Sequence, residues 1–316
     1  MHLTVIIPTC GRTGLLERAL GSVLAQDWQD WDAVVVDDGD GDGIETAHGL
    51  ADARIEALPN EGRGQVDARS TALARARGEL VCWLDDDDWW DDAGHLSLLA
   101  ATAAAETACF FCRGGWIVHE PEGGREVFDH DATAESLHQN NTILTSSLAY
   151  PRTVHDELGP LDRELGSYGD WDLILRMCEA GLAPRKLPGL GVCYAVHGAN
   201  VSAAVDTPAR LAGFRRLVAK HELDTDIHSH VTMHRMLGGP EGWNDVGGKL
   251  EREFAFGSFP EAVAFVNRVS ELAESENHHP DIEVHYDKVV LRWWTHTAGG
   301  ITDRDRELAQ RSSELA

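Results

Sequence analysis

The stretch LVCWLDDDDWW, from Leu80 to Trp90, joins a short apolar run directly to four consecutive aspartates and two tryptophans. Leu80–Leu84 is continuously apolar and too short for a helix, so it predicts a strand that is buried on both faces. Carboxylates crowded at the end of a buried strand repel one another unless a cation lies among them. At the carboxyl end of a parallel strand, such a cluster predicts a divalent-metal site; the alternative is a solvated acidic turn.

The first half of the chain alternates short apolar runs with amphipathic ones. Besides Leu80–Leu84, we expect strands at Leu3–Pro8, Ala33–Val36 and Ile55–Leu58. We expect helices after Thr13, which can serve as a cap, and at Val66–Ala76 and Ala93–Ala105. This alternation predicts an α/β fold with a mostly parallel sheet and helices on both faces. Ligands of such sheets bind at the carboxyl ends of the strands.

A different pattern follows a polar, histidine-rich stretch at residues 221–234, which we interpret as a solvated linker rather than a metal site. Thr302 is expected to cap a last helix, with Asp305 as its partner in a capping box. The remaining elements are a strand at Leu250–Phe256, a helix at Phe259–Ala273 and one or two strands in Glu283–Thr297. The sequence therefore predicts a small α+β domain with an antiparallel sheet, and we place the two domains at residues 1–228 and 229–316.

Composition narrows the classes of function. The chain has 316 residues and a formal net charge of −26, which argues against nonspecific binding to nucleic acid or to an anionic membrane. No apolar run approaches the roughly 20 residues of a membrane span. A strand is predicted at once from residue 3, so we expect no signal peptide and a cytoplasmic location. The six cysteines are scattered, which indicates free thiols rather than a zinc or redox site.

Five motifs within the first 225 residues resemble, in their order, the inverting family 2 glycosyltransferases of the GT-A fold. They are VIIPTCGR (Val5–Arg12), VVVDDGDGDG (Val34–Gly43), GQVDARSTALARARGELVCWLDDDDWW (Gly64–Trp90), YGDWDLILRM (Tyr168–Met177) and YAVHGANVS (Tyr194–Ser202). The resemblance implies a nucleotide-diphospho-sugar transferase with a Rossmann-like, mostly parallel sheet. Its donor would be UDP-, GDP- or dTDP-linked, whereas its acceptor is not implied by these motifs.

The resemblance also implies roles for individual residues. Asp87 would be the principal ligand of Mn²⁺ or Mg²⁺, with Asp85 and His197 as further ligands. Asp170 would be the general base that takes a proton from the acceptor hydroxyl as it attacks the anomeric carbon. The residues implied to bind the nucleotide-sugar are Pro8, Thr9, Arg12, Asp37, Asp38, Arg69, Asp85 and Asp86.

Purely structural roles are the alternative for the isolated members of this set. Asp38 could end its strand in a turn, Asp170 could cap the helix that begins near Trp171, and His197 could be a packed loop histidine. The order of the motifs favours the functional roles over these alternatives.

Residues 235–316 resemble pterin-4a-carbinolamine dehydratase, on the motifs GWND (Gly242–Asp245), ESENHHPD (Glu274–Asp281) and THTAGGITDRDRELA (Thr295–Ala309). That enzyme expels a hydroxide equivalent from a 4a-hydroxypterin and removes a ring proton, and imidazoles can serve as acid and base near neutral pH. The resemblance implies a pterin ligand and a catalytic trio of His278, His279 and His296. The implied supporting residues of the pterin site are Trp243, Glu274 and Asp305.

Three interpretations of the whole chain remain open. The first is a metal-dependent transferase that also carries 4a-hydroxytetrahydrobiopterin dehydratase activity. In the second, the C-terminal domain only drives assembly into a homo-oligomer, a use that the dehydratase resemblance makes credible. In the third, the dehydratase is the main activity and the transferase half is degenerate. A nucleotidyltransferase has less support, because no glycine-rich basic phosphate loop follows the first strand.

Overall fold

The computed structural model describes residues 1–316 except 107, 122, 198–206, 239–241, 247–248 and 297–299. Contacts within the chain divide it into two units, Met1–His230 and Val231–Ala316, which are described separately below. Two parts of the motifs quoted above, residues 198–202 and 297–299, lie outside the described residues.

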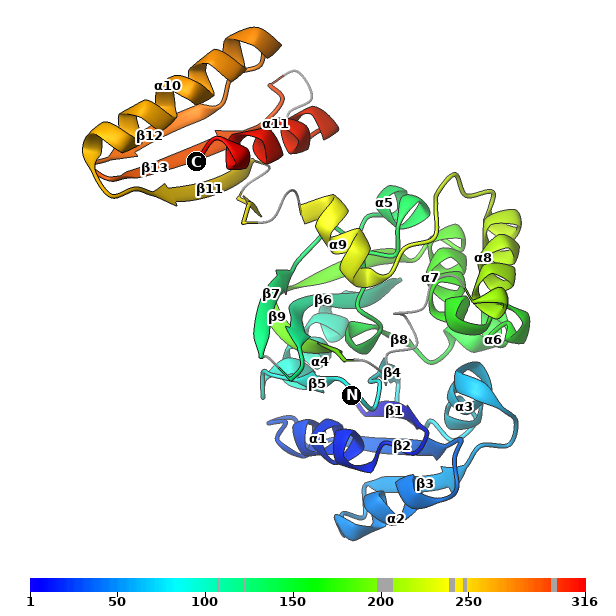
Figure 1. Ribbon diagram of the computed structural model, residues 1–316. Helices are drawn as coiled ribbons and strands as arrows, with labels where there is room; N and C mark the ends of the chain where they lie inside the picture. The colour runs from blue at the N-terminus through cyan, green and yellow to red at the C-terminus, as the bar shows by residue number, and fades with distance from the viewer. Residues whose placement is uncertain (107, 122, 198–206, 239–241, 247–248, 297–299) are drawn as a thin grey trace. The chain divides into compact units, whose positions relative to one another are not determined.

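A nine-stranded sheet forms the centre of the first unit (Figure 1). Its strands are β1 (Leu3–Thr9), β2 (Trp31–Asp37), β3 (Ile55–Pro59), β4 (Leu80–Trp83), β5 (Trp89–Trp90), β6 (Cys109–His119), β7 (Gly124–Phe128), β8 (Ala149–Pro151) and β9 (Ala183–Val196). The order is β3-β2-β1-β4-β8-β6-β9-β5, with β7 paired to β6. Strands β3, β2, β1 and β4 pair in parallel, as expected, and so do β6 and β9, whereas β8, β7 and β5 join the sheet antiparallel.

The helices of this unit connect the strands and cover the sheet. They are α1 (Thr13–Leu24), α2 (Asp42–Gly49), α3 (Gly64–Leu73), α4 (His95–Ala105), α5 (Ala134–Gln139), α6 (Val154–Leu158), α7 (Gly169–Glu179) and α8 (Pro208–His221), with short 3₁₀ helices η1 (Thr145–Ser147) and η2 (Arg163–Tyr168). Figure 1 shows α1 and α2 beside the β1–β3 end of the sheet. Apolar residues of α3, α5, α6 and α7 share one core with Val81 and Trp83 of β4 and with Ile6 of β1.

The structure corrects two details of the predicted helices. Helix α2, which is not among the helices expected from the sequence, begins at Asp42, directly after Gly41 in a left-handed conformation (φ 101°). Thr13 is the first residue of α1 rather than its cap, because Arg12 occupies the cap position. Arg12 makes no capping hydrogen bond, and its guanidinium bonds to aspartates after β4 instead.

Strand register places three polar strand ends side by side. Thr9, at the end of β1, pairs with Asp37, at the end of β2. Ile6 of β1 pairs with Trp83, the last residue of β4. All four residues of β4 are buried, as the apolar run predicts, and the Trp83 indole donates to the Tyr150 hydroxyl at 2.8 Å. The aspartates after β4 therefore lie at the same sheet edge as the ends of β1 and β2.

The second unit is an α+β domain with an antiparallel sheet, which confirms the predicted pattern. Its elements are β10 (Asn244–Asp245), β11 (Leu250–Ala255), α10 (Phe259–Glu276), β12 (Asp281–His285), β13 (Lys288–Trp293) and α11 (Asp303–Glu314). The strand order is β10-β11-β13-β12. Phe254, Phe265 and Trp293 are prominent in its core. The predicted capping box of Thr302 and Asp305 is present at the start of α11.

The histidine-rich stretch matches the expected linker only in part: residues 223–229 form neither helix nor strand, whereas both ends of the stretch are helical. At its start, His221 is buried in the last turn of α8 and bonds to Asp172 and Glu179. Toward its end, helix α9 (His230–Gly238) begins. The sequence did not reveal the buried role of His221 because Asp172 and Glu179 lie 49 and 42 residues away. Among the described helices, none combines the length and the apolar character that crossing a bilayer requires.

Candidate functional site

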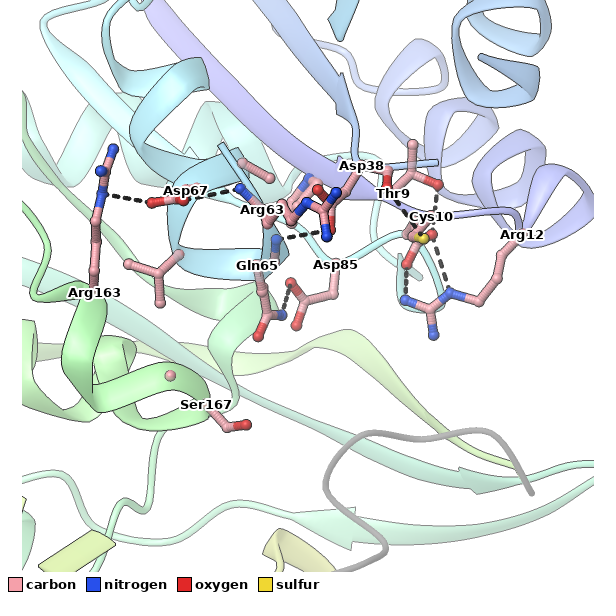
Figure 2. Close-up of a pocket in the computed structure, with 16 residues that line it drawn as sticks. Thr9, Cys10, Arg12, Asp38, Arg63, Gln65, Asp67, Asp85, Arg163 and Ser167 are labelled. Atoms are coloured by element: carbon pink, nitrogen blue, oxygen red, sulfur yellow. Dashed lines mark hydrogen bonds and ion pairs between the residues drawn. The ribbon is translucent and has the colours of Figure 1, made fainter. Parts of the chain in front are cut away.

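A pocket of about 450 Å³ opens where β1, β2 and β4 end (Figure 2). Helix α3 and the 3₁₀ helix η2 provide its other sides. Its lining residues are Pro8, Thr9, Cys10, Arg12, Asp38, Arg63, Gly64, Gln65, Val66, Asp67, Ala68, Asp85, Asp86, Arg163, Gly166 and Ser167. The pocket thus contains most of the residues that the sequence indicated for donor binding, with Asp37 and Arg69 outside the lining.

Asp37 and Asp38 have different surroundings. Asp37 is buried and accepts the N–H groups of Gly39 at 2.7 Å and Gly43 at 3.0 Å, so it holds the turn after β2. Asp38 lines the pocket and accepts from Asn60 Nδ2 at 2.7 Å and from the N–H of Gly64 at 2.8 Å. These two donors fix the Asp38 carboxylate against the pocket, whereas Asp37 shapes the loop behind it.

Asp86 acts as an anchor for its neighbours. Thr9 Oγ1 donates to its Oδ2 at 2.6 Å, and both Nε and Nη2 of Arg12 donate to its carboxylate. Burial raises the pKa of Asp86 to about 6, although Arg12 and Thr9 act in the opposite direction. A wholly buried carboxylate with these partners positions Arg12 at the edge of the pocket.

Asp85, Asp87 and Asp88 form the group that could hold a metal ion. Oxygen atoms from these three carboxylates lie within 4.8 Å of one another. Asp85 pairs with Arg69 Nη2 at 2.5 Å, and Asp87 Oδ2 accepts from Arg12 Nη1 at 2.7 Å. Three clustered carboxylates are the oxygen ligands that hard divalent cations prefer, so these residues fit Mn²⁺ or Mg²⁺.

Asp88 is a member of this group that the sequence did not single out. It is fully buried and accepts from the Ser146 hydroxyl and from the N–H of Ala195 at 2.9 Å. Burial, together with the charges of Asp87 and Asp85, raises the pKa of Asp88 well above its usual range. A cation among the three carboxylates would relieve this repulsion.

His197 lies beside the cluster rather than within it. Its Nε2 is 3.2 Å from Asp87 Oδ2, the same oxygen that Arg12 contacts. The sequence resemblance predicted His197 as a metal ligand. In the structure it contacts Asp87, which is the predicted principal ligand.

Asp170 lies in the first turn of α7, after Tyr168 at the cap position. Its carboxylate accepts from Thr145 Oγ1 at 2.8 Å and from the N–H of Trp171 at 2.8 Å, and the residue is 8% exposed. Helix η2, which lines the pocket with Arg163, Gly166 and Ser167, leads directly into α7. Sequence reasoning missed Thr145, which lies 25 residues away in a stretch without a recognisable pattern.

In the second unit, one of the three expected catalytic histidines is tightly held. His278 Nε2 lies 2.6 Å from Asp305 Oδ1. The His278 ring stacks on that of Trp293, with 5.6 Å between the ring centroids and 7° between the ring planes. Burial opposes ionisation of Asp305, yet hydrogen bonds from Thr295, His278 and Thr302 lower its pKa. An ionised, buried Asp305 therefore fixes the orientation of the His278 ring.

The other expected residues of this site differ in exposure. His279 is exposed and contacts Glu274 Oε1 at 3.0 Å, and His296 is exposed with its ring 3.8 Å from that of Trp294. In the described part of this unit, no hydrogen bond joins the three imidazoles to one another. Trp243 belongs to the core, where it is 5% exposed and its indole donates to Ser313 Oγ at 2.9 Å.

Two family models match the chain. One, described as Glycosyl transferase family 2, matches residues 4–149, and the other, Pterin 4 alpha carbinolamine dehydratase, matches residues 225–315. A putative pterin-4-alpha-carbinolamine dehydratase of Thermomicrobium roseum is 51% identical over 86 residues, which cover 27% of this chain and 92% of that protein. The uncharacterized glycosyltransferase YwdF of Bacillus subtilis is 28% identical over 233 residues, which cover 71% of this chain and 85% of that protein.

Solved structures resemble the first unit in fold. Staphylococcus aureus TarS 1–349 in complex with UDP-GlcNAc has a TM-score of 0.59 at 18% identity, and the match covers 75% of this chain and 71% of that one. The mannosyltransferase PcManGT of Pyrobaculum calidifontis, in complex with GDP-Man and Mn²⁺, has a TM-score of 0.53 at 21% identity. That match covers 72% of this chain and 66% of the PcManGT chain. The chain therefore belongs, in its C-terminal part, to the pterin-4a-carbinolamine dehydratase family, fused to an N-terminal glycosyltransferase family 2 domain of the GT-A fold.

Proposed function

We propose that the N-terminal domain transfers a sugar, with inversion, from a UDP-, GDP- or dTDP-linked donor to an acceptor hydroxyl. The observation that carries this proposal is the cluster of Asp85, Asp87 and Asp88 at the edge of the pocket where β1, β2 and β4 end. A divalent cation held by Asp85 and Asp87, with His197 beside them, would supply positive charge to the diphosphate leaving group. The UDP-GlcNAc complex of TarS and the GDP-Man and Mn²⁺ complex of PcManGT support both the donor class and the metal.

The residues of the chain have separable roles in this reaction. Asp38 would accept a hydrogen bond from the nucleotide, because its carboxylate faces the pocket and is held by Asn60 and Gly64. Asp170 would be the general base, since Thr145 and the N–H of Trp171 orient its carboxylate. The hydroxyl deprotonated by Asp170 would attack the anomeric carbon on the face opposite the nucleoside diphosphate. The bond to that leaving group would break as the new bond forms, which inverts the configuration.

Thermal stabilisation by nucleoside diphosphates tests the donor site. We expect one of UDP, GDP and dTDP to raise the melting temperature only with Mn²⁺, and Asp87→Asn to abolish that shift. Asp91→Asn is the matched control, because Asp91 lies at the surface beside the same segment and pairs with Arg125. Wild-type protein that no nucleotide stabilises under any metal would contradict the proposal.

For the C-terminal domain, we propose retained dehydratase activity on a 4a-hydroxypterin. The supporting observation is the His278–Asp305 pair at 2.6 Å, which leaves His278 oriented by a buried carboxylate. Dehydration of 4a-hydroxytetrahydropterin by the full chain, followed by absorbance, should be lost when His278, His279 and His296 are all changed to Gln. The competing scaffold role predicts no turnover by wild type and an oligomer that dissociates when residues 229–316 are removed.

A further inference from the structure

His230, the first residue of α9, belongs by its contacts to the first unit. Its Nε2 lies 3.2 Å from the carbonyl oxygen of Ile143. Its ring centroid is 5.7 Å from that of Tyr194 and 6.1 Å from that of Phe128. These contacts hold His230 against the transferase half, although the residue falls in the stretch matched by the dehydratase family model.

Two of the residues that contact His230, Ile143 and Tyr194, belong to segments that hold the proposed active site. Ile143 is two residues before Thr145, which donates to Asp170. Tyr194 directly precedes Ala195, whose N–H donates to Asp88 of the carboxylate cluster. His230 thus lies where the support of the proposed base and the support of the proposed metal site come together.

The contact with Ile143 fixes which nitrogen of His230 carries the proton. A carbonyl oxygen only accepts, so Nε2 must donate and the lone pair of the neutral ring lies on Nδ1. Burial lowers the pKa of His230, against the opposite effect of the nearby Asp170 carboxylate, so the ring is neutral near pH 7. Among the described residues, Nδ1 has no hydrogen-bond partner.

We propose that His230 and Tyr194 form part of the acceptor subsite, where Nδ1 of His230 accepts a hydrogen bond from a hydroxyl group of a neutral carbohydrate. This inference rests on the proposed transferase function. The aromatic rings offer flat apolar surfaces of the kind that pack against the C–H face of a sugar ring. The lone pair on Nδ1 accepts a hydrogen bond from a hydroxyl group and repels an anionic group. The negative charges of Asp85 and Asp170 also disfavour an anion at this position, whereas the positive charge of Arg210 favours one.

Two substitutions at position 230 separate the hydrogen bond at Nδ1 from the packing of the ring. His230→Gln can keep the bond to Ile143 but presents no acceptor where Nδ1 was, whereas His230→Asn can place its amide oxygen near that position. His48→Gln, on the exposed side of α2, is the matched control. The full chain would be assayed with Mn²⁺ and the donor whose nucleotide stabilises it, using glucose, galactose, mannose and N-acetylglucosamine as acceptors and glucuronic acid as the anionic comparison.

We expect His230→Gln to lower kcat/KM for the best neutral acceptor by about tenfold, the effect of one hydrogen bond, while KM for the donor stays unchanged. His230→Asn should recover part of the loss, His48→Gln should behave as wild type, and glucuronic acid should be the poorest acceptor. The inference is overturned if no neutral sugar accepts, if glucuronic acid is preferred, or if His230→Gln leaves acceptor kinetics intact. Failure of the proposed function is distinct, because no nucleotide would then stabilise the wild type.

Discussion

Arg12 Nη1 donates to Asp87 Oδ2 at 2.7 Å, so the proposed principal metal ligand is paired with a side-chain cation. The same guanidinium also bonds to the buried Asp86. Arg12 therefore supplies positive charge to the aspartates after β4, and a divalent cation at Asp87 would share this oxygen or displace the guanidinium from it.

Arg12→Gln is expected to destabilise the metal-free protein, because it leaves Asp86 buried without its counter-charge. Loss of one partner of such a pair costs roughly 3 kcal/mol of unfolding free energy. Added Mn²⁺ should raise the melting temperature of the variant more than that of wild type, since it would restore the missing charge. Urea unfolding with and without Mn²⁺ measures both effects; equal metal shifts in the two proteins would contradict this account of Arg12.

Asp86 should make the free energy of unfolding fall as the pH rises. Burial raises its pKa from 3.8 to about 6, so the folded state binds this proton more tightly than the unfolded state. Its contribution is fully present below about pH 4 and is lost as the pH passes 6, a change of about 3 kcal/mol. In chelator-treated protein, Asp86→Asn should have a flatter stability profile than wild type across this range. Asp91→Asn should keep the wild-type slope.

His221 should produce a second pH dependence, at higher pH. Burial alone would lower its pKa, but the bonds to Asp172 and Glu179 outweigh burial and raise it above 6.5. The stabilisation is therefore complete below pH 6.5 and is lost as the pH rises through the raised value. His221→Gln should cost more unfolding free energy at pH 6 than at pH 9, by about 1 kcal/mol or more. An equal cost at both values would mean that His221 is neutral in the folded protein.

Asp170→Asn should strongly slow transfer while leaving nucleotide binding intact. Loss of a general base lowers kcat by about 10²- to 10⁴-fold. Thr145→Val, which removes a hydroxyl that orients Asp170, should lower kcat by about tenfold with little change in KM. Thr46→Val is the control, because the Thr46 hydroxyl donates to the Asp42 carbonyl within α2. Loss of nucleotide binding in Asp170→Asn would assign this residue to the donor site instead.

In the C-terminal domain, His278→Gln and Asp305→Asn should have different effects. Asp305 bonds to His278 and closes the capping box of α11 with Thr302. Asp305→Asn should therefore lower the dehydration rate and also the free energy of unfolding, the latter by roughly 1–2 kcal/mol through loss of the cap. His278→Gln should lower dehydration with a much smaller loss of stability, because the ring is partly exposed. Equal stability of the two variants would remove the structural role given to Asp305.

The sequence predicted the architecture because its patterns are local. The apolar run before Asp85 could only be a buried strand, and the alternation in the second unit matched an antiparallel sheet. Helix α2 was missed because Asp42 and Gly43 favour a turn by composition. The buried role of His221 was missed because Asp172, which bonds to it, lies 49 residues earlier.

The candidate site was predicted only in part, for a related reason. A run of four aspartates indicates a metal site but does not say which carboxylates meet. Asp88 joins the group through Ser146 and Ala195, which lie 58 and 107 residues away. Thr145 and His230 carry no motif, and only the fold brings them to Asp170 and Ile143.

The four aspartates after β4 are identical residues in a row, yet each contacts a different partner in the structure. Asp85 turns to Arg69, Asp86 to Thr9, Asp87 to His197 and Asp88 to Ala195. Deleting any one of them would leave the same three-residue sequence, DDD, and would shift the rest out of phase with their partners. The length of the run therefore matters because the position of each aspartate decides its partner. The total negative charge alone would not specify these contacts.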